Sequence, residues 1–329
     1  MADDDAPGWD AIDGALRVLY PGVEPRHWGT LISYRLGGPD PLDGISAYPR
    51  STPFPHWHYV TYGFSDLYEG SGDGATSGYG FELTMRVYVP ELGPEAPTWP
   101  VVLLQGLARY VFSSGFVLKV GDYIDLEAPI TDTLPTQLRG LAVAADPELG
   151  PIQSPFGTAD FRQVVGLTAD EVAVCKGWRT GEFLEVLTPD LPLLLTDLGR
   201  PSFATRPRIQ QAVAEGVRRD GSSTGALYSP ELTVAVSDAG VVLTLTQQAV
   251  GDLLLVLPGR IPLGRALRLE GTDRAVIFQP GAVPRVVAAS DGQIAVELTP
   301  PAMDALIASI GGTPGSYRTP IPGLTVAVA

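Results

Sequence analysis

Apolar residues recur at helical spacing in five parts of the chain, which predicts five helices. Asp10 is placed to cap the first of them, and Gly311 is placed to end the last. Thr168-Ala169-Asp170-Glu171 has the form of a capping box, in which a hydroxyl and a carboxylate satisfy amides at a helix start. The predicted helices cover residues 9–19, 100–113, 168–175, 209–217 and 300–310.

Between these helices lie short runs that are rich in β-branched and aromatic residues, a composition typical of strands. Several runs in the last third of the chain are separated by turns that contain glycine. They predict a small sheet there, covered by the last helix. The predicted strands cover residues 58–65, 81–89, 121–128, 138–144, 159–167, 232–236, 241–246, 253–257, 266–270, 275–278 and 294–298.

A change in charge divides the chain. The net charge is −13 through Leu227 and −2 from Tyr228 onward. The change coincides with a polar stretch bearing glycine and serine, residues 218–225, which follows a helical pattern and precedes strand patterns as a linker does. The chain of 329 residues is also long enough for two domains. We therefore expect a two-lobed α+β protein with mixed sheets and flanking helices in each lobe, divided into residues 1–227 and 228–329.

The overall composition narrows the classes of partner. A net charge of −15 argues against nucleic acid and anionic membranes, because both need a basic protein face. A single cysteine, Cys175, precludes an internal disulfide and fits a reducing compartment. Residues 1–5 are acidic where a signal peptide would be basic, and no apolar run approaches the roughly 18 residues of a spanning helix. We expect a soluble, cytoplasmic protein.

Three features invite a catalytic interpretation. His56 and His58 would share one face of a strand, a geometry that a metal can use, but no neighbouring His or Cys completes an ordinary zinc set. The glycine-rich stretch at 70–80 matches no phosphate-binding pattern, and Ser65 lacks the second glycine of a nucleophile elbow. We expect no bound metal and no cofactor. A metal-dependent hydrolase that uses the His-x-His pair and a carboxylate remains the alternative.

Several unusual strings stand in one order along the chain, and together they resemble the Suppressor of Fused family. The likeness covers nearly the whole chain, with long motifs in the first lobe and shorter ones in the second. In the first lobe the motifs lie at 36–43, 56–60, 63–68, 77–84, 98–100, 105–112, 153–157 and 163–166. In the second lobe they lie at 258–260 and 264–265.

The resemblance implies binding rather than catalysis. In the animal members, two lobes close around a short segment of a transcription factor, which joins the structure as an added strand. By motif match, the tyrosine of the string at residues 106–112 is Tyr110, and the aspartate after the following glycine is Asp122. These two residues are the predicted partner-binding site. Tyr110 offers a broad amphipathic contact, and Asp122 offers an anion to a donor on the peptide.

The chain departs from the animal pattern. Ala144-Ala145 precedes Asp146-Pro147 where the animal protein has a second acidic residue, and a long insertion is missing. The compact form resembles bacterial relatives, which are similar to immunity proteins of toxin systems. The predicted function is therefore a non-catalytic module that captures an extended segment of a protein partner, such as a cognate toxin, between its two lobes. A purely structural homo-oligomer is a third possibility, and the sequence does not indicate an oligomeric state.

Overall fold

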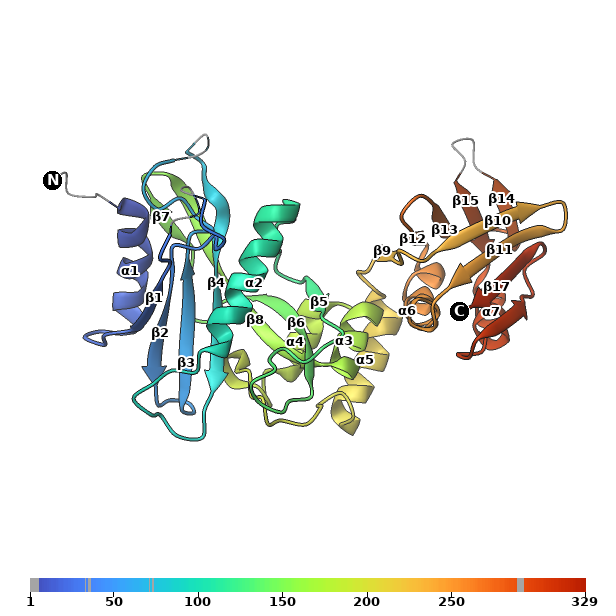
Figure 1. Cartoon of the computed structure of the whole chain (residues 1–329). Helices are drawn as coiled ribbons and strands as arrows, with labels where there is room; N and C mark the ends of the chain where they lie inside the picture. The colour runs from blue at the N-terminus through green and yellow to red at the C-terminus, as the bar shows by residue number, and fades with distance from the viewer. Residues whose placement is uncertain (1–5, 33, 35–36, 71, 73, 289–292) are drawn as a thin grey trace. The chain divides into compact units, whose positions relative to one another are not determined.

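The computed structural model describes the chain except residues 1–5, 33, 35–36, 71, 73 and 289–292, and it has two compact units (Figure 1). The first unit comprises Met1–Val172 with Leu184–Phe203, and the second comprises Ala173–Phe183 with Ala204–Ala329. Both units contain helices and strands, which confirms the α+β prediction. The division of the chain into two domains after Leu227 stays a prediction.

One large sheet forms the first unit. Its strands run in the order β1-β2-β3-β4-β8-β6-β5, with β7 paired to β8 beside this path. The pairing of β4 with β8 is parallel, and the other pairings are antiparallel. The bounds are β1 (Arg26–Gly29), β2 (Gly44–Arg50), β3 (His56–Tyr62), β4 (Thr76–Tyr88), β5 (Tyr123–Asp125), β6 (Leu138–Ala145), β7 (Ile152–Ser154) and β8 (Gly157–Thr168).

Two helices cover the sheet because its central strands are apolar on both faces. Along β3, Trp57 and Tyr59 belong to the core formed with helix α2, whereas Val60 and Tyr62 belong to the core formed with helix α1. This alternation follows from the period of two in a strand. The helices and the short turn of this unit are α1 (Pro7–Leu19), α2 (Trp99–Ser114) and η2 (Pro192–Leu194).

Local signals explain where α1 and α2 begin and end. Helix α2 has Pro100 in its first turn and ends at Gly115, whose φ of 71° is the left-handed conformation that glycine adopts easily. Helix α1 begins at Pro7, so Asp10 lies inside its first turn and is not the cap that the sequence predicts.

The predicted capping box is only half formed. Two short helices, α3 (Ala169–Gly177) and α4 (Thr180–Leu187), cross the division between the units. At the start of α3, the Glu171 carboxylate accepts a bond from the Thr168 amide at 3.0 Å, as the box requires. The Thr168 hydroxyl donates to the Asp170 carboxylate instead of accepting from an amide. The Glu171 carboxylate also accepts a bond from the Arg200 guanidinium, at 2.6 Å.

The second unit contains two sheets rather than the single one expected. The four-stranded sheet has the order β10-β11-β17-β16, and the five-stranded sheet has the order β14-β15-β13-β12-β9. Its helices are α5 (Pro207–Asp220), α6 (Gln247–Val256) and α7 (Pro300–Ser309), with short turns η3 (Leu257–Gly259) and η4 (Ile261–Leu263). The strands are β9 (Ala226–Tyr228), β10 (Thr233–Ser237), β11 (Gly240–Leu245), β12 (Leu267–Glu270), β13 (Ala275–Pro280), β14 (Arg285–Ala288), β15 (Ile294–Leu298), β16 (Gly315–Arg318) and β17 (Leu324–Val328).

Three expectations for the second unit were wrong. Residues 253–257, predicted as a strand, lie mostly in α6, which begins where the Thr246 hydroxyl accepts a bond from the Ala249 amide at 3.2 Å. An apolar run alone does not distinguish a buried helix from a buried strand. The sequence analysis expected the last helix alone to cover the sheet, and α6 is a further helix in this unit. Gly311 is not the left-handed cap of α7, because the helix ends at Ser309 and the residue that follows, Ile310, is already in extended conformation.

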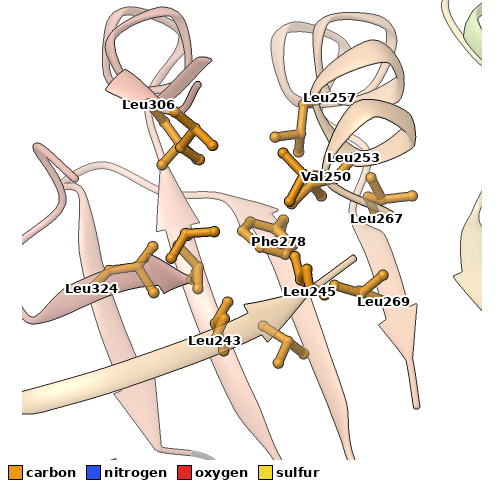
Figure 2. Close-up of a cluster of buried hydrophobic side chains, with 14 of the residues drawn as sticks. Leu243, Leu245, Val250, Leu253, Leu257, Leu267, Leu269, Phe278, Leu306 and Leu324 are labelled. Carbon is orange, nitrogen blue, oxygen red and sulfur yellow. The ribbon is translucent and has the colours of Figure 1, made fainter. Parts of the chain in front are cut away.

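Phe278 lies at the centre of the apolar core in this unit (Figure 2). Val250 and Leu253 of α6 lie above its ring in this view, and Leu243 and Leu245 of β11 lie below it. Its side chain is only 1% exposed. The ring therefore joins helix α6 to both sheets, since Phe278 itself lies on β13.

We expect Phe278→Ala to lower the free energy of unfolding by about 3–5 kcal/mol, because it removes a buried ring and leaves a cavity. Urea denaturation of the full chain measures the loss. Val283→Ala is the control: this residue is 61% exposed, and its truncation is expected to stay within about 0.5 kcal/mol of the wild type. Equal effects of the two substitutions would show that Phe278 is not central to the core.

Candidate functional site

Helix α2 presents two different faces. Its buried stripe includes Leu104, Leu107 and Val111, which pack on the sheet. Val102 and Tyr110 lie on the same side of the helix as each other, two turns apart, and are 67% and 47% exposed. The helix therefore displays apolar side chains away from the core that it covers.

A groove of about 850 Å³ lies beside this second face. It is lined largely by apolar side chains, and all of its lining residues belong to the first unit. Two carboxylates, Asp125 and Asp132, also line it. The lining residues are Thr98, Trp99, Val102, Leu103, Gly106, Leu107, Arg109, Tyr110, Phe116, Leu118, Tyr123, Ile124, Asp125, Leu126, Pro129, Ile130, Thr131, Asp132 and Thr133.

Tyr110 lies in this groove. Its ring is 6.1 Å from the ring of Phe116, between centroids, and Phe116 is 51% exposed. The main-chain oxygen of Tyr110 accepts bonds from the hydroxyls of Ser113 and Ser114, so the helix end that carries the ring is held locally. The two rings form an exposed aromatic pair, which is typical of protein contact surfaces.

Asp122 lies outside the lining and closes the turn that leads into β5. Its carboxylate accepts a bond from the Lys119 amide at 2.7 Å, and its own amide donates to the Lys119 carbonyl at 2.9 Å. Its carbonyl accepts from the Val143 amide of β6 at 2.9 Å. The structure thus places Tyr110 in the groove, and it places Asp122 in the turn that positions the strand on the groove wall.

Strand β5 is at the end of the strand order, with β6 as its neighbour in the sheet. All three of its residues line the groove. The groove is therefore bounded by an apolar helix face and by the last strand of the sheet. Sequence analysis missed the groove residues other than Tyr110. The spacing of four between Val102, Gly106 and Tyr110 is the signal that could have revealed a second face on this helix.

The His-x-His pair is built into a buried polar network on the α1 side of the sheet. His56 Nδ1 lies 2.7 Å from the Phe54 carbonyl oxygen. His58 Nδ1 lies 2.8 Å from the Tyr20 hydroxyl, and its Nε2 lies 3.3 Å from the Asp146 carboxylate. Burial, reinforced by the charge of Arg86, lowers the pKa of His58 to about 4, so the ring is neutral at pH 7.

No group of three or more His, Cys, Asp or Glu side chains in the described ranges is placed to hold a metal ion. Both histidines already have partners inside the first unit. Ser65, the other nucleophile considered, donates its hydroxyl to the Glu82 carboxylate at 2.6 Å and is 6% exposed. Both histidines and Ser65 are thus held by hydrogen bonds within the first unit.

A fully buried arginine organises the same network. Arg86 is 0% exposed and donates two bonds to Asp146, at 2.7 and 3.0 Å. Burial by itself would raise the pKa of Asp146, but the neighbouring His58 and Arg86 outweigh it and hold that pKa well below its usual range. Arg86 also lies 3.1 Å from Glu148, which in turn pairs with Arg50 at 2.6 Å.

We expect Asp146→Asn to lower the free energy of unfolding by about 3–5 kcal/mol, because it removes the carboxylate that holds the buried Arg86 through two bonds and leaves only the partly exposed Glu148 as a counter-charge. Chemical denaturation of the full chain measures the change. Asp40→Asn is the matched control, since Asp40 pairs with Arg109 at the surface and its loss is expected to cost less than about 1 kcal/mol. A change as small as the control's would contradict a central role for the ion pair.

Glu82 is a second buried ionisable group, and it holds the start of the family-like motif at residues 63–68. Its Oε1 accepts bonds from the amides of Gly63 and Ser65, at 3.0 and 2.9 Å, besides the Ser65 hydroxyl. Its Oε2 accepts from the Thr61 hydroxyl at 2.6 Å. Burial raises the pKa of Glu82 to about 7, although these hydrogen bonds oppose the rise.

We expect Glu82 to make stability fall as pH rises from 4.5 to about 7. Over this interval the folded chain keeps a proton that the unfolded chain releases, so the contribution is full below pH 4.5 and is lost near pH 7. His58 contributes the opposite slope, because its pKa is lowered on folding. At each pH, subtracting the free energy of unfolding of Glu82→Gln from that of the wild type isolates the contribution of Glu82.

Urea denaturation at a series of pH values measures this difference. As pH rises, the free energy of unfolding of the wild type should fall relative to that of Glu82→Gln by up to about 1.4 kcal/mol per pH unit, which is the slope for one proton. Glu95→Gln, at a site whose side chain is 83% exposed, should show no such trend. Parallel curves for wild type and Glu82→Gln would contradict the raised pKa.

The fold and the groove define an α+β protein with an apolar groove of about 850 Å³ beside the last strand of a sheet. A family model described as Suppressor of fused protein (SUFU) matches residues 38–201, which include the groove. The human Suppressor of fused homolog is 39% identical over 235 residues, which cover 66% of this chain and 48% of the human protein. The chain belongs to the Suppressor of fused family.

Two solved structures extend this comparison. A crystal structure of Drosophila Suppressor of Fused matches with a TM-score of 0.79 and 24% identity, over 99% of this chain and 98% of the other, which shows the same fold. A chain from the crystal structure of the Sufu-Fu complex matches with a TM-score of 0.59 and 35% identity, over 64% of this chain and 98% of the other. The chain spans about half the length of the curated relatives that it matches.

Within the described residues, no helix combines the length and the hydropathy that crossing a bilayer requires.

Proposed function

We propose that this protein is a non-catalytic binding module that captures an extended segment of a partner protein in the groove between α2 and β5. The single observation that carries the proposal is the groove itself, with the exposed ring of Tyr110 beside the last strand of the sheet. A relative that is 35% identical has been solved as a Sufu-Fu complex, so a protein of this family binds a protein partner. Apolar grooves with aromatic side chains are common peptide-binding surfaces.

The charge of the chain supports a basic partner. The net charge is −15, and two carboxylates, Asp125 and Asp132, line the groove. Asp122 adds a third carboxylate on the turn before β5. Complementary charge raises the rate of association and selects among partners more than it raises affinity. The proposed segment therefore combines apolar residues for the groove with Lys or Arg residues for its rim.

The finer part of the proposal concerns biological role. An immunity protein masks a cognate toxin, and an acidic module with an apolar groove suits a basic toxin as well as a regulatory partner. Cys175 is buried and is the chain's sole cysteine, so it forms no internal disulfide, which supports a reducing location such as the cytoplasm. Recovery of the partner from the native cell, with identification by mass spectrometry, tests which role applies.

We expect Tyr110→Ala and Asp122→Arg each to weaken binding of the recovered partner, measured by isothermal titration calorimetry. Removing the ring empties part of the groove, and reversing a charge near a basic segment costs about 2–5 kcal/mol. Asp122→Asn separates the two roles of this residue, because the amide oxygen still accepts from Lys119 while the charge is lost. An electrostatic role requires that Asp122→Asn also weakens binding.

Matched controls lie on the second unit. Tyr228 is 70% exposed on β9, and Asp238 is exposed in the turn between β10 and β11, so Tyr228→Ala and Asp238→Arg repeat the same changes at residues that do not line the groove. We expect both controls to bind as the wild type does. Unchanged affinity in both Tyr110→Ala and Asp122→Arg would reject the site. Failure to recover any foreign partner, with self-association instead, would reject the function.

A further inference from the structure

A second cavity lies on the α1 side of the first unit, in a different place from the groove. Its volume is about 520 Å³, and α1, the loop after it, and strands β1 and β2 line it. It is rich in aromatic and ionisable side chains rather than aliphatic ones. The volume is within the usual range for sites that hold small molecules or single side chains.

Three of the rings that line this cavity, those of Trp9, Tyr20 and Tyr48, are stacked on another ring. Trp9 stacks on Tyr62 with ring centroids 4.1 Å apart, and it lies 5.7 Å from the ring of His27. Tyr20 stacks on Tyr48 at 4.7 Å, and both rings are almost fully buried. Contacts inside the protein therefore hold these rings in place before anything binds. Aromatic rings held in this way attract cations through the negative potential of their faces.

The same aromatic pair already carries one cation. The Arg50 guanidinium lies 6.0 Å from the centre of the Tyr20 ring. Its charge is balanced by Glu148, at 2.6 Å, so Arg50 does not make the neighbourhood strongly positive. One positive group is thus already placed near the rings in this part of the molecule.

Two carboxylates complete the cavity. Asp13 Oδ1 accepts a bond from the Tyr62 hydroxyl at 2.8 Å, which orients the carboxylate beside the aromatic wall. Glu24 is exposed at the cavity surface. One arginine, Arg17, opposes them, but its side chain is 70% exposed and lies 3.5 Å from Asp13, a weak surface pair. Burial lowers the pKa of His27, so that ring adds no charge at neutral pH.

We propose that this cavity binds an organic cation, an alkyl ammonium or guanidinium group, held between the Trp9 and Tyr48 side chains and the Asp13 carboxylate. The group can come from a free amine or from a Lys or Arg side chain of a peptide, and the chemistry of recognition is the same for both. The site does not depend on the function proposed for the groove, because the residues that line the two sites are different.

Titration of the full chain at constant ionic strength tests the proposal. The probes are n-butylammonium, N-acetyl-lysine amide and N-acetyl-arginine amide, with N-acetyl-norleucine amide as the uncharged analogue of lysine. The indole N–H signal of Trp9, assigned by comparison with Trp9→Phe, reports binding in nuclear magnetic resonance spectra. We expect the cationic probes to shift this signal with dissociation constants of about 1 mM, and norleucine amide to leave it unchanged.

Two variants on the same helix separate local recognition from general charge. Asp13→Asn removes the charge from the cavity but keeps the oxygen that accepts from Tyr62, and it should weaken binding by about fivefold or more. Asp10→Asn makes the same change at an exposed position of α1 outside the cavity and should leave affinity within about twofold.

The outcomes are distinct. Stronger binding of n-butylammonium than of the blocked lysine assigns the site to free amines, and the reverse assigns it to basic side chains; both support the proposal. Equal binding of norleucine amide, an equal loss in Asp10→Asn and Asp13→Asn, or no shift of the Trp9 signal with any cation would overturn it. Partner binding at the groove stays intact in Asp13→Asn if the two sites are independent, so failure of one proposal leaves the other testable.

Discussion

The buried pair of Arg86 and Asp146 is the interaction on which the first unit depends. A charged guanidinium without solvent needs a partner and well-placed acceptors, or the fold loses several kcal/mol. Asp146 supplies the charge, and the Gln163 side-chain oxygen supplies a further acceptor. The amide of Gln163 then donates to the carbonyls of Leu193 and Leu194, at 2.7 and 3.0 Å. One buried charge thus links strands β4 and β8 to the segment that contains η2.

The same pair explains how the histidines and the α1 cavity are held. His58 lies between Asp146 and the hydroxyl of Tyr20, and the ring of Tyr20 is part of the cavity wall. Leu193 and Leu194 both have φ of 54°, a conformation that costs non-glycine residues energy, and the Gln163 amide donates to the carbonyls of both. The α1 side of the sheet therefore combines an apolar core with a buried network of hydrogen bonds and ion pairs.

The two faces of the sheet differ in the side chains that gather on them. The α2 face contains the apolar core and the groove, while the α1 face contains the polar network and the aromatic cavity. In the function proposed above, a groove formed before the partner arrives lowers the ordering cost of association. The acidic net charge and the membership in the Suppressor of fused family agree with a protein that works by binding. Tyr110 and Asp122 stay predicted site residues, with the ring in the groove and the carboxylate in the adjoining turn.

Local signals in the sequence determined the mixed α+β class, the family likeness and the helices α1, α2, α3, α5 and α7. Pro100 and Gly115 act within one turn of their own position, so α2 was predictable, and Tyr110 followed from a motif on that helix. Thr246 caps α6, but the apolar run within this helix is equally compatible with a strand, so the sequence analysis missed α6. Only the tertiary structure placed β5 at the end of the sheet and joined Arg86 to Asp146, which are 60 residues apart. Strand order and long-range ion pairs depend on which distant segments pack together, and no spacing along the chain records that choice.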